Sequence, residues 1–463
     1  MLPIVALVGR PNVGKSTLFN VLTGTRDAIV SDVPGVTRDR QYGFASGPAS
    51  CVVIDTGGLV EHPTGLEAQM RAQTERAVAE ADWLVLLADA RAGLTPQDEL
   101  IARELRRSGK PITLAVNKAE GLDQEAACAE FHRLGLGEPF AIAASHGAGC
   151  RELIARVLEG LEGPETGEQA GEARLEHADA IRIAIVGRPN VGKSTLVNRL
   201  IGEERVIAGE EPGTTRDRIL VPFRRDERDF VLIDTAGMRR RARIEDDLER
   251  VSVAKTLQAI GEAHVVVLVL DAHDAVAEQD ASLLGIALAR GRALLIAVNK
   301  WDGVDPPQRD TIRRQLELKL DFTPFVPWFF ISARHGTGVG ELARAAARAF
   351  DSAMREMPTS ALTRVLERAI VTQQPPLVRG RRIKLKFAHQ GGRNPPRIIV
   401  HGNQTQAVPA TYERYLGNMF RRAFELYATP VRIEFRTDEN PYAGRTRRRE
   451  PRRRIRSRRS SQH

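Results

Sequence analysis

The sequence has few cysteines and no long hydrophobic run. Its three cysteines, Cys51, Cys128 and Cys150, have neither the spacing of a disulfide framework nor that of a metal site. We therefore expect them to pack as small apolar side chains in a reducing compartment, which predicts a cytoplasmic protein. The longest apolar runs, such as Val265 to Leu270, are far shorter than the roughly 20 residues that cross a bilayer. Met1 to Arg10 does not resemble a signal peptide, so we expect no stable membrane insertion.

Charge is unevenly distributed along the 463 residues. Residues 1–356 contain 44 lysines and arginines against 52 aspartates and glutamates, whereas residues 357–444 contain 14 against 6 and residues 445–463 contain 10 against 1. The C-terminal part is therefore a separate basic unit, which is typical of a surface that binds a polyanion. Its arginine-rich end has almost nothing apolar, so we expect disorder there until an anionic partner binds, or else a merely solubilising role.

A ten-residue segment occurs twice, at Gly9 to Leu18 and at Gly187 to Leu196. Each copy follows a β-branched apolar run and precedes a helical pattern, which is the context of a phosphate-binding P-loop. The backbone N–H groups then face phosphate oxygens at a helix N-terminus. The lysine neutralises the β- and γ-phosphates, and the serine after it binds Mg²⁺. The predicted residues are Gly9, Arg10, Pro11, Asn12, Val13, Gly14, Lys15, Ser16 and Thr17 in the first copy, and Gly187, Arg188, Pro189, Asn190, Val191, Gly192, Lys193, Ser194 and Thr195 in the second.

Apolar runs alternate with helical patterns in residues 1–160 and again in residues 181–354. Such alternation predicts βαβ units with a parallel sheet, helices on both faces, and a ligand site at the carboxyl ends of the strands. Residues 161–180 are acidic and lack apolar periodicity, which predicts a flexible linker. Residues 355–440 have the pattern of a small α+β domain, and residues 441–463 form the arginine-rich tail. The predicted fold class is α/β with two tandem P-loop domains.

Two further motifs follow each P-loop. The first contains a threonine that would give Mg²⁺ a second hydroxyl only when a γ-phosphate orders the loop, unless the motif is a simple polar turn. The second ends an apolar strand, so that its aspartate reaches the magnesium shell and its last glycine offers an N–H to the γ-phosphate. The threonines are Thr37 and Thr215, and the second motif is Asp55, Thr56, Gly57 and Gly58 in one domain and Asp234, Thr235, Ala236 and Gly237 in the other.

A later motif in each domain is expected to recognise the base. A carboxylate at its fourth position accepts two hydrogen bonds from guanine, whereas adenine would leave it unpaired, so the motif selects GTP and GDP over ATP. A further loop would direct a backbone N–H to guanine O6. The motif is Asn117, Lys118, Ala119 and Glu120 in the first domain and Asn299, Lys300, Trp301 and Asp302 in the second, and the N–H groups are those of Ala144 and Ala333. Glu120 is one methylene longer than aspartate and Ala143 replaces the Ser332 of the second domain, which leaves the affinity of the first site open.

These motifs, in one order and present twice, resemble those of the translation-factor-like GTPases. Two such domains followed by a small basic domain resemble one family in particular, the double GTPase Der, also called EngA. The likeness includes Ala388 to Pro396, His401 to Asn403 and Pro441-Tyr442. It implies a monomeric GTPase that acts in assembly of the bacterial large ribosomal subunit, with rRNA and precursor particles as partners and a KH-like third domain. No Gly-x-x-Gly occurs from residue 357 onward, so the usual KH clamp on single-stranded RNA is missing and this region is as much a candidate protein contact as an RNA reader.

The residue after each Asp-x-x-Gly motif is apolar, Leu59 or Met238, and neither can orient a water molecule. Hydrolysis must then depend on positioning and charge neutralisation, and we expect slow intrinsic turnover. GTPases with this feature and a P-loop asparagine are often stimulated by potassium, so the resemblance implies that Asn12 and Asn190 bind K⁺. The residues expected to be catalytic are Lys15, Thr37, Asn12, Lys193, Thr215 and Asn190.

Two other functions remain open on the sequence. An RNA-modifying enzyme controlled by GTP would need its own catalytic centre, and the C-terminal third contains no cysteine, no Ser-His-Asp signature and no metal-ligand cluster. We interpret His389, His401 and His463 there as isolated residues. A GTPase scaffold on acidic membranes would use the arginine tail, but no amphipathic helix or lipidation motif accompanies it.

Overall fold

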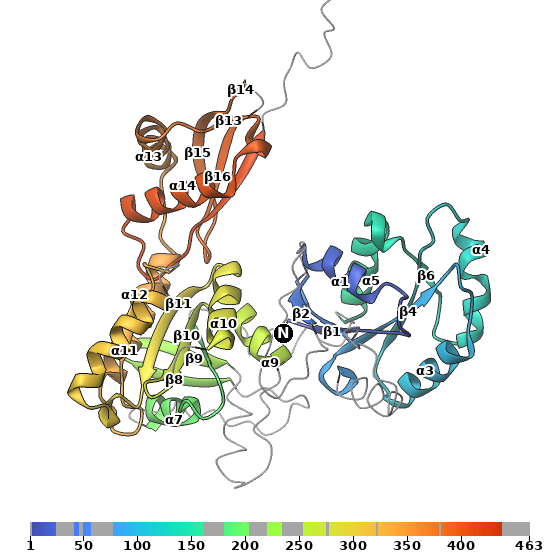
Figure 1. Cartoon of the computed structure of the whole chain (residues 1–463), viewed down its shortest axis with the longest axis horizontal. Coiled ribbons are helices and arrows are strands. Elements are labelled where there is room, and N and C mark those ends of the chain that lie inside the picture. Colours follow the sequence, from blue (N-terminus) through green and yellow to red (C-terminus); the bar gives the residue numbers. More distant parts are fainter. Residues whose placement is uncertain are drawn as a thin grey trace, which may run out of the picture. The chain divides into compact units, whose positions relative to one another are not determined.

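The computed structural model of the chain (Figure 1) forms two compact units. The first comprises Met1–Glu356, Gly392–Pro396 and Arg421–Arg432, and the second Met357–Gly391, Arg397–Phe420 and the segment that begins at Ile433. The structure describes residues 2–24, 41–45, 50–56, 77–161, 180–202, 220–233, 253–274, 277–320, 323–378 and 381–437. Nearly all of the predicted linker and all of the predicted tail therefore lie outside the described residues.

The first predicted domain contains a six-stranded sheet of order β2-β3-β1-β4-β5-β6. All neighbouring strands are parallel except β2, which pairs antiparallel to β3. The strands are β1 (Ile4–Val8), β2 (Gln41–Phe44), β3 (Val52–Asp55), β4 (Trp83–Asp89), β5 (Ile112–Asn117) and β6 (Phe140–Ala141). The helices are α1 (Lys15–Thr23), α3 (Pro96–Arg107), α4 (Gln124–Cys128) and α5 (Cys150–Leu161).

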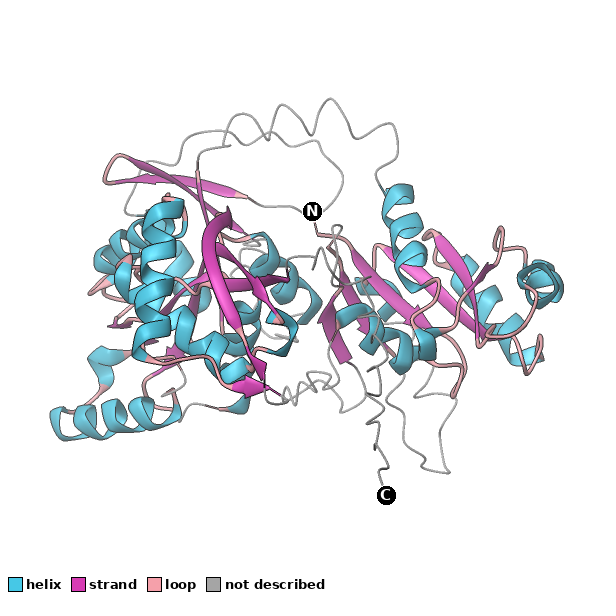
Figure 2. Cartoon of the chain, turned by 90° about the horizontal axis from the view of Figure 1, so that it is seen from above, coloured by secondary structure: helices cyan, strands magenta, loops and turns pink. Residues whose placement is uncertain are grey.

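The second domain repeats this topology in the order β12-β11-β10-β7-β9-β8, with β8 antiparallel to β9. Its strands are β7 (Ile181–Val186), β8 (Val221–Arg225), β9 (Arg228–Ile233), β10 (Val265–Asp271), β11 (Ala293–Asn299) and β12 (Trp328–Phe330). Its helices are α7 (Lys193–Gly202), α9 (Val253–Glu262), α10 (Glu278–Ala289), α11 (Pro306–Lys319) and α12 (Val339–Ala353). The helices flank the strands of each sheet (Figure 2).

The predicted sheets of mostly parallel strands are confirmed, whereas the alternation of apolar runs does not predict the edge strands β2 and β8. Both are short, and β2 has only one buried residue, Tyr42, so that neither has the continuous apolar run that marks the central strands. The turn from β8 to β9 places Asp226 and Glu227 at φ values of 45° and 60°, which is the backbone of a two-residue hairpin. The sheets are thus mostly parallel, with one antiparallel strand at an edge.

Apolar side chains cover both faces of the central strands. On β1, Ile4, Ala6 and Val8 pack into one core cluster, while Val5 and Leu7 belong to another that includes residues of α1 and α5. A parallel strand needs this continuous apolar sequence because helices cover both of its faces. Cys51, Cys128 and Cys150 are buried and unpaired, which confirms the prediction that they pack as small apolar residues.

The second unit contains a three-stranded sheet of order β15-β16-β17 and two helices, which confirms the small α+β domain. Its elements are α13 (Thr359–Thr372), β13 (Leu377–Val378), β14 (Arg381–Arg382), β15 (Lys384–Gly392), β16 (Arg397–Asn403), α14 (Ala410–Ala423) and β17 (Arg432–Thr437). Tyr412 and Tyr415 of α14 donate hydroxyl hydrogen bonds to carbonyls at the end of α13. Among the described residues, no helix has the length and apolar character needed to cross a membrane.

Two stretches within the predicted third domain belong to the first unit. Asn394 donates its backbone N–H to the carbonyl of Ala353 at 3.1 Å, and Tyr427 donates to the hydroxyl of Ser352 at 2.7 Å. The N–H of Leu294, on β11, donates to the carbonyl of Ala428 at 2.8 Å. Removal of everything after residue 356 would therefore expose part of the core of the second P-loop domain.

Candidate functional site

Both P-loops connect a buried strand to a helix through glycines at positions where any other residue would be strained. Gly9 and Gly14 have φ values of 154° and 98°, and Gly187 and Gly192 have almost the same values, 150° and 95°. A Cβ on Gly14 would lie 2.2 Å from the side-chain nitrogen of Asn117, so the loop needs glycine for space as well as for backbone conformation. The N-terminus of α1 thereby lies at the carboxyl end of β1, where a phosphate would be bound.

The P-loop lysines are buried against their own loops. Lys15 is 6% exposed, and its ammonium group donates to the carbonyls of Gly9 and Arg10, each at 2.8 Å. Burial lowers the pKa of Lys15 to about 8, although the nearby carboxylate of Asp55 acts in the opposite direction. Lys193 occupies the same place in the second domain and donates to the carbonyl of Arg188 at 2.5 Å. Lys15 therefore remains charged at neutral pH and is available to phosphate oxygens.

The residues described in the first domain suit a magnesium-bound nucleotide. Ser16 lies in the first turn of α1, and Asp55 ends β3, which pairs with β1 so that Leu7 and Asp55 are opposite each other. The first turn of α1 and the end of β3 thus supply a hydroxyl and a carboxylate at the carboxyl edge of the sheet, and these are the hard oxygen ligands that Mg²⁺ prefers. The hydroxyl of Thr56 donates to the carbonyl of Leu7 at 2.8 Å and fixes the end of β3.

An asparagine ties each P-loop to the loop that was predicted to contact guanine O6. The side-chain amide of Asn117 donates to the carbonyl of Val13 at 2.8 Å, and its oxygen accepts the N–H of Ala144 at 3.0 Å. In the second domain Asn299 makes the same two bonds, to Val191 at 2.8 Å and from Ala333 at 2.9 Å. The N–H groups of Ala144 and Ala333 therefore donate to asparagine here, and their contact with guanine stays a prediction.

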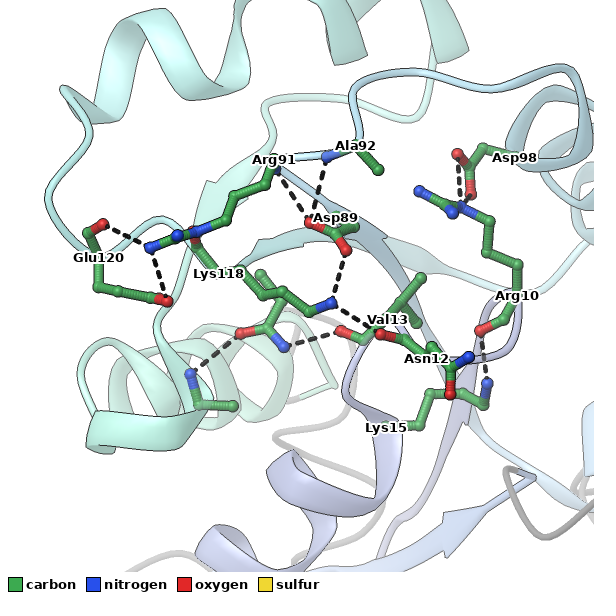
Figure 3. Close-up of polar contacts among 12 residues, drawn as sticks. Arg10, Asn12, Val13, Lys15, Asp89, Arg91, Ala92, Asp98, Lys118 and Glu120 are labelled. Atoms are coloured by element: carbon green, nitrogen blue, oxygen red, sulfur yellow. Dashed lines mark hydrogen bonds and ion pairs between the residues drawn. The ribbon is translucent and has the colours of Figure 1, made fainter.

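A second link to the P-loop comes from the lysine of the same motif. Lys118, at a left-handed φ of 65°, donates to the carbonyl of Asn12 at 2.8 Å and forms an ion pair with Asp89 at 2.6 Å (Figure 3). Burial on its own raises the pKa of Asp89, but the hydrogen bonds from Lys118 and from the N–H groups of Arg91 and Ala92 outweigh it, and the pKa is lowered. Lys300 pairs in the same way with Asp271 at 2.5 Å.

A buried aspartate holds the arginine of each P-loop. Asp98 is fully buried and accepts from Nε of Arg10 at 3.2 Å on each carboxylate oxygen, while also capping α3 through Thr95. Asp280 accepts from Nε of Arg188 at 3.0 Å in the second domain. These aspartates, and those that hold the motif lysines, were missed by the sequence analysis. Asp98 and Asp280 occupy equivalent positions in the two domains, and so do Asp89 and Asp271. An alignment of the two halves of the sequence would have revealed them.

The two carboxylates expected to read guanine have different surroundings. In the second domain the hydroxyl of Ser332 donates to Asp302 and lowers its pKa, and His335 lies 3.3 Å from the carboxylate. In the first domain Glu120 instead forms an ion pair with Arg91 at 3.0 Å (Figure 3), and Ala143 cannot donate a comparable bond. The sites therefore share the phosphate-binding frame and differ at the base.

Several predicted residues lie outside the part of the chain that the structure describes. They are Thr37, Gly57, Gly58 and Leu59 in the first domain and Thr215, Asp234, Thr235, Ala236, Gly237 and Met238 in the second. The expected roles of these residues in magnesium binding and in sensing the γ-phosphate remain predictions. All other predicted site residues are described, and those that carry the phosphate-binding frame come together in each domain as the motif order implies.

Comparisons with known proteins agree with this arrangement. A family described as "50S ribosome-binding GTPase" matches residues 4–118 and 182–300, and one described as "KH-domain-like of EngA bacterial GTPase enzymes, C-terminal" matches residues 356–436. GTPase Der of Thioalkalivibrio sulfidiphilus is 55% identical over 100% of this chain and 99% of its own length. The Der proteins of Methylococcus capsulatus and Ectopseudomonas mendocina are 54% and 52% identical, with 96% of this chain covered in each case and 95% and 94% of the relatives.

Two P-loops with matching asparagine and lysine contacts, a KH-like third domain and full-length identity above one half lead to one conclusion. The chain is a GTPase that belongs to the Der family.

Proposed function

We propose that this GTPase binds the large ribosomal subunit and acts in its assembly, and that the nucleotide state of the two G domains determines when its basic C-terminal region contacts rRNA. The charge distribution is the main support, because residues 357–463 are basic and residues 1–356 are net acidic. A basic surface gains affinity by releasing counterions from phosphates, which an acidic domain cannot do. The family description supports the 50S subunit as the partner. On this proposal the protein works as a monomer in the cytoplasm.

The chemistry proposed for each site is hydrolysis of GTP to GDP and phosphate with Mg²⁺. Magnesium would be held by Ser16, Thr37 and Asp55 in the first domain and by Ser194, Thr215 and Asp234 in the second, and would neutralise charge on the phosphates. Lys15 and Lys193 would bind the β- and γ-phosphates. Leu59 and Met238 cannot orient water, so the protein must accelerate hydrolysis through positioning and positive charge.

Potassium is the proposed source of the additional positive charge. Asn12 and Asn190 have left-handed φ values of 63° and 61°, which asparagine tolerates better than most residues, so backbone conformation alone could explain them. Replacement of Asn12 and Asn190 by glycine keeps that conformation and removes the amide. If the amide binds the cation, hydrolysis by the unaltered protein should be faster in potassium than in sodium, and the glycine variants should lose this difference and still bind GDP. Equal rates of the unaltered protein in the two salts would reject the proposal.

The contribution of the basic region should be tested by substitution, because deletion would uncover the core of the second G domain. Exposed basic residues of the KH-like domain are replaced by glutamate together, namely Arg364, Lys384, Arg414 and Arg436. A matched control reverses four exposed arginines of the first G domain, namely Arg103, Arg107, Arg133 and Arg151.

Co-sedimentation with large-subunit particles is then measured between about 50 and 200 mM salt, a range over which six to ten phosphate contacts weaken binding by roughly 10³–10⁵. We expect the variant in the KH-like domain to bind more weakly and with a shallower salt dependence, and the control to bind like the unaltered protein. Removal of residues 445–463 tests the tail separately. Unchanged affinity and salt slope in both the charge variant and the tail deletion would refute the assignment of the basic region to rRNA.

A further inference from the structure

Three aromatic rings of the KH-like domain stack on one another across two strands. Phe387 and His401 have ring centroids 4.4 Å apart with an interplanar angle of 6°, and His389 and His401 are 5.1 Å apart at 28°. Phe387 and His389 are 6.3 Å apart. The interpretation of His389 and His401 as isolated residues was therefore wrong. We call Phe387, His389 and His401 the aromatic platform.

The aromatic platform lies on the face of the sheet opposite to the side chains of Ala388 and Val400. Ala388 and Val400 are fully buried. Because successive side chains of a strand point to opposite faces, Phe387 and His389 flank Ala388 on the other face, and His401 follows Val400 there. Phe387 is 38% exposed, and the two histidines are half-buried. An apolar ring is thus presented to solvent at the edge of a stack.

The surroundings of the aromatic platform carry positive charge. Arg436 of β17, a strand of the same sheet, is exposed. Arg397 of β16 forms an ion pair with Glu434 of β17 at 3.3 Å, so the negative charge of this glutamate is neutralised. Residues 357–444 as a whole contain 14 basic side chains against 6 acidic ones. A partner suited to this face therefore has flat apolar groups and negative charge together.

We propose that the aromatic platform binds unpaired RNA bases by stacking, while the basic side chains near it contact the phosphates. This inference rests on the proposed function, because it names the part of the basic region that contacts RNA. Cross-strand aromatic pairs also stabilise sheets, but that role alone does not account for an exposed outer ring in a basic field. Stacking on aromatic side chains is how proteins bind single strands without reading their sequence. It would also take the place of the Gly-x-x-Gly clamp that this domain lacks.

The test measures binding of the full chain to a mixed-sequence single-stranded RNA of twelve nucleotides that contains 2-aminopurine, and to a duplex of the same length. Phe387→Leu and His401→Leu keep apolar bulk and remove the flat ring. His401→Phe restores a ring, and Val371→Ala changes an apolar side chain that is 84% exposed on α13. Thermal unfolding of every variant is recorded to identify any loss of folded protein.

We expect each leucine variant to bind the single strand about 5- to 150-fold more weakly, the range for one lost stacking contact. The salt dependence should not change, because no charge is removed. His401→Phe and Val371→Ala should bind like the unaltered protein, and duplex binding should be the same for all. In the unaltered protein, binding should change the fluorescence of 2-aminopurine, because the base exchanges its neighbours in the strand for a protein ring; this result does not depend on any variant folding.

Three outcomes would overturn the inference. If the unaltered protein binds the single strand with no change in 2-aminopurine fluorescence, or if the leucine variants bind it as tightly, RNA is held elsewhere and only the aromatic platform assignment fails. If the leucine variants keep their affinity for RNA but lose affinity for ribosomal particles, this face contacts a protein. If the unaltered protein binds neither RNA nor ribosomal particles, the proposed function fails as well.

Discussion

Replacement of Ser332 by alanine tests how the second G domain holds the carboxylate that reads guanine. The hydroxyl of Ser332 donates to Asp302, and this bond is the main reason why the pKa of Asp302 is lowered. A hydrogen bond to a charged group contributes about 1.5–3 kcal/mol. The side chain of Asp302 is 41% exposed, so water replaces part of the lost bond, and we expect the lower end of that range or slightly less, about 1–1.5 kcal/mol. This corresponds to GDP binding that is weaker by roughly 5- to 12-fold.

The measurement is a fluorescence titration with labelled GDP on the full chain. A Lys15→Ala background silences the first site, so that only the second site contributes. The pH dependence gives a second observable with a definite sign. A lowered pKa keeps Asp302 ionised as the solution is acidified, and loss of Ser332 raises that pKa toward its ordinary value. The variant should therefore begin to lose affinity for GDP at a higher pH than the parent protein. Equal affinities and superimposable pH profiles would show that Ser332 does not hold the carboxylate.

Asp302, Lys15 and Asp98 each give one further prediction. Asp302→Asn should shift the second site from guanine toward xanthine nucleotides, because the amide offers a donor where the carboxylate accepted; competition between GDP, XDP and ADP measures this, and unchanged preference for GDP would contradict it. The pKa of Lys15 is about 8, so GDP binding to the first site should weaken as the pH rises above 8 and should be accompanied by proton uptake. Calorimetry in buffers of different ionisation enthalpy detects this uptake. Absence of proton uptake at pH 8.5 would argue against the prediction. Asp98→Ala should lower the free energy of unfolding by about 3 kcal/mol, because it leaves Arg10 without its buried partner, and urea unfolding beside the exposed control Gln97→Ala would test this.

The phosphate-binding part of the site could be predicted because its chemistry is local. The conformation of Gly14, the start of α1 at Lys15 and the strand before them all follow from contiguous residues, so a single motif fixes their geometry. The same holds for the central strands, whose unbroken apolar runs reflect burial on both faces. Edge strands such as β2 lack this signature because one side is only partly covered, and pairing with β3 decides their structure.

The residues that hold the motifs in place could not be predicted from one pass along the chain. Asp89 lies 29 residues before Lys118, and Asp98 lies 88 residues after Arg10, so each looks like an ordinary turn or helix-cap residue in its own segment. The stack of His389 on His401 depends on the register between two strands, which neither strand encodes alone. Tertiary placement gives all of these residues their roles.

The surroundings of the two base-reading carboxylates differ at three positions, so mutation of these positions can give one site the surroundings of the other. In the first domain Arg91 pairs with Glu120 and Ala143 offers no hydroxyl, whereas the equivalent positions of the second domain are His273, Asp302 and Ser332. His273 contacts Asp271 and the carbonyl of Gly303, whereas Arg91 at the equivalent position of the first domain contacts the base-reading carboxylate.

The phosphate-binding frame is the same in both sites, so exchange of these three residues alone should transfer the behaviour of one site to the other. A chain that carries Arg91→His, Glu120→Asp and Ala143→Ser, in a Lys193→Ala background, should bind GDP at the first site with the pH profile of the second. Glu120→Asp alone should shift the pH profile of GDP binding less, because the aspartate would still lack a hydrogen bond from a serine hydroxyl. If the triple variant keeps the pH profile of the unaltered first site, the difference between the sites does not arise from these three residues.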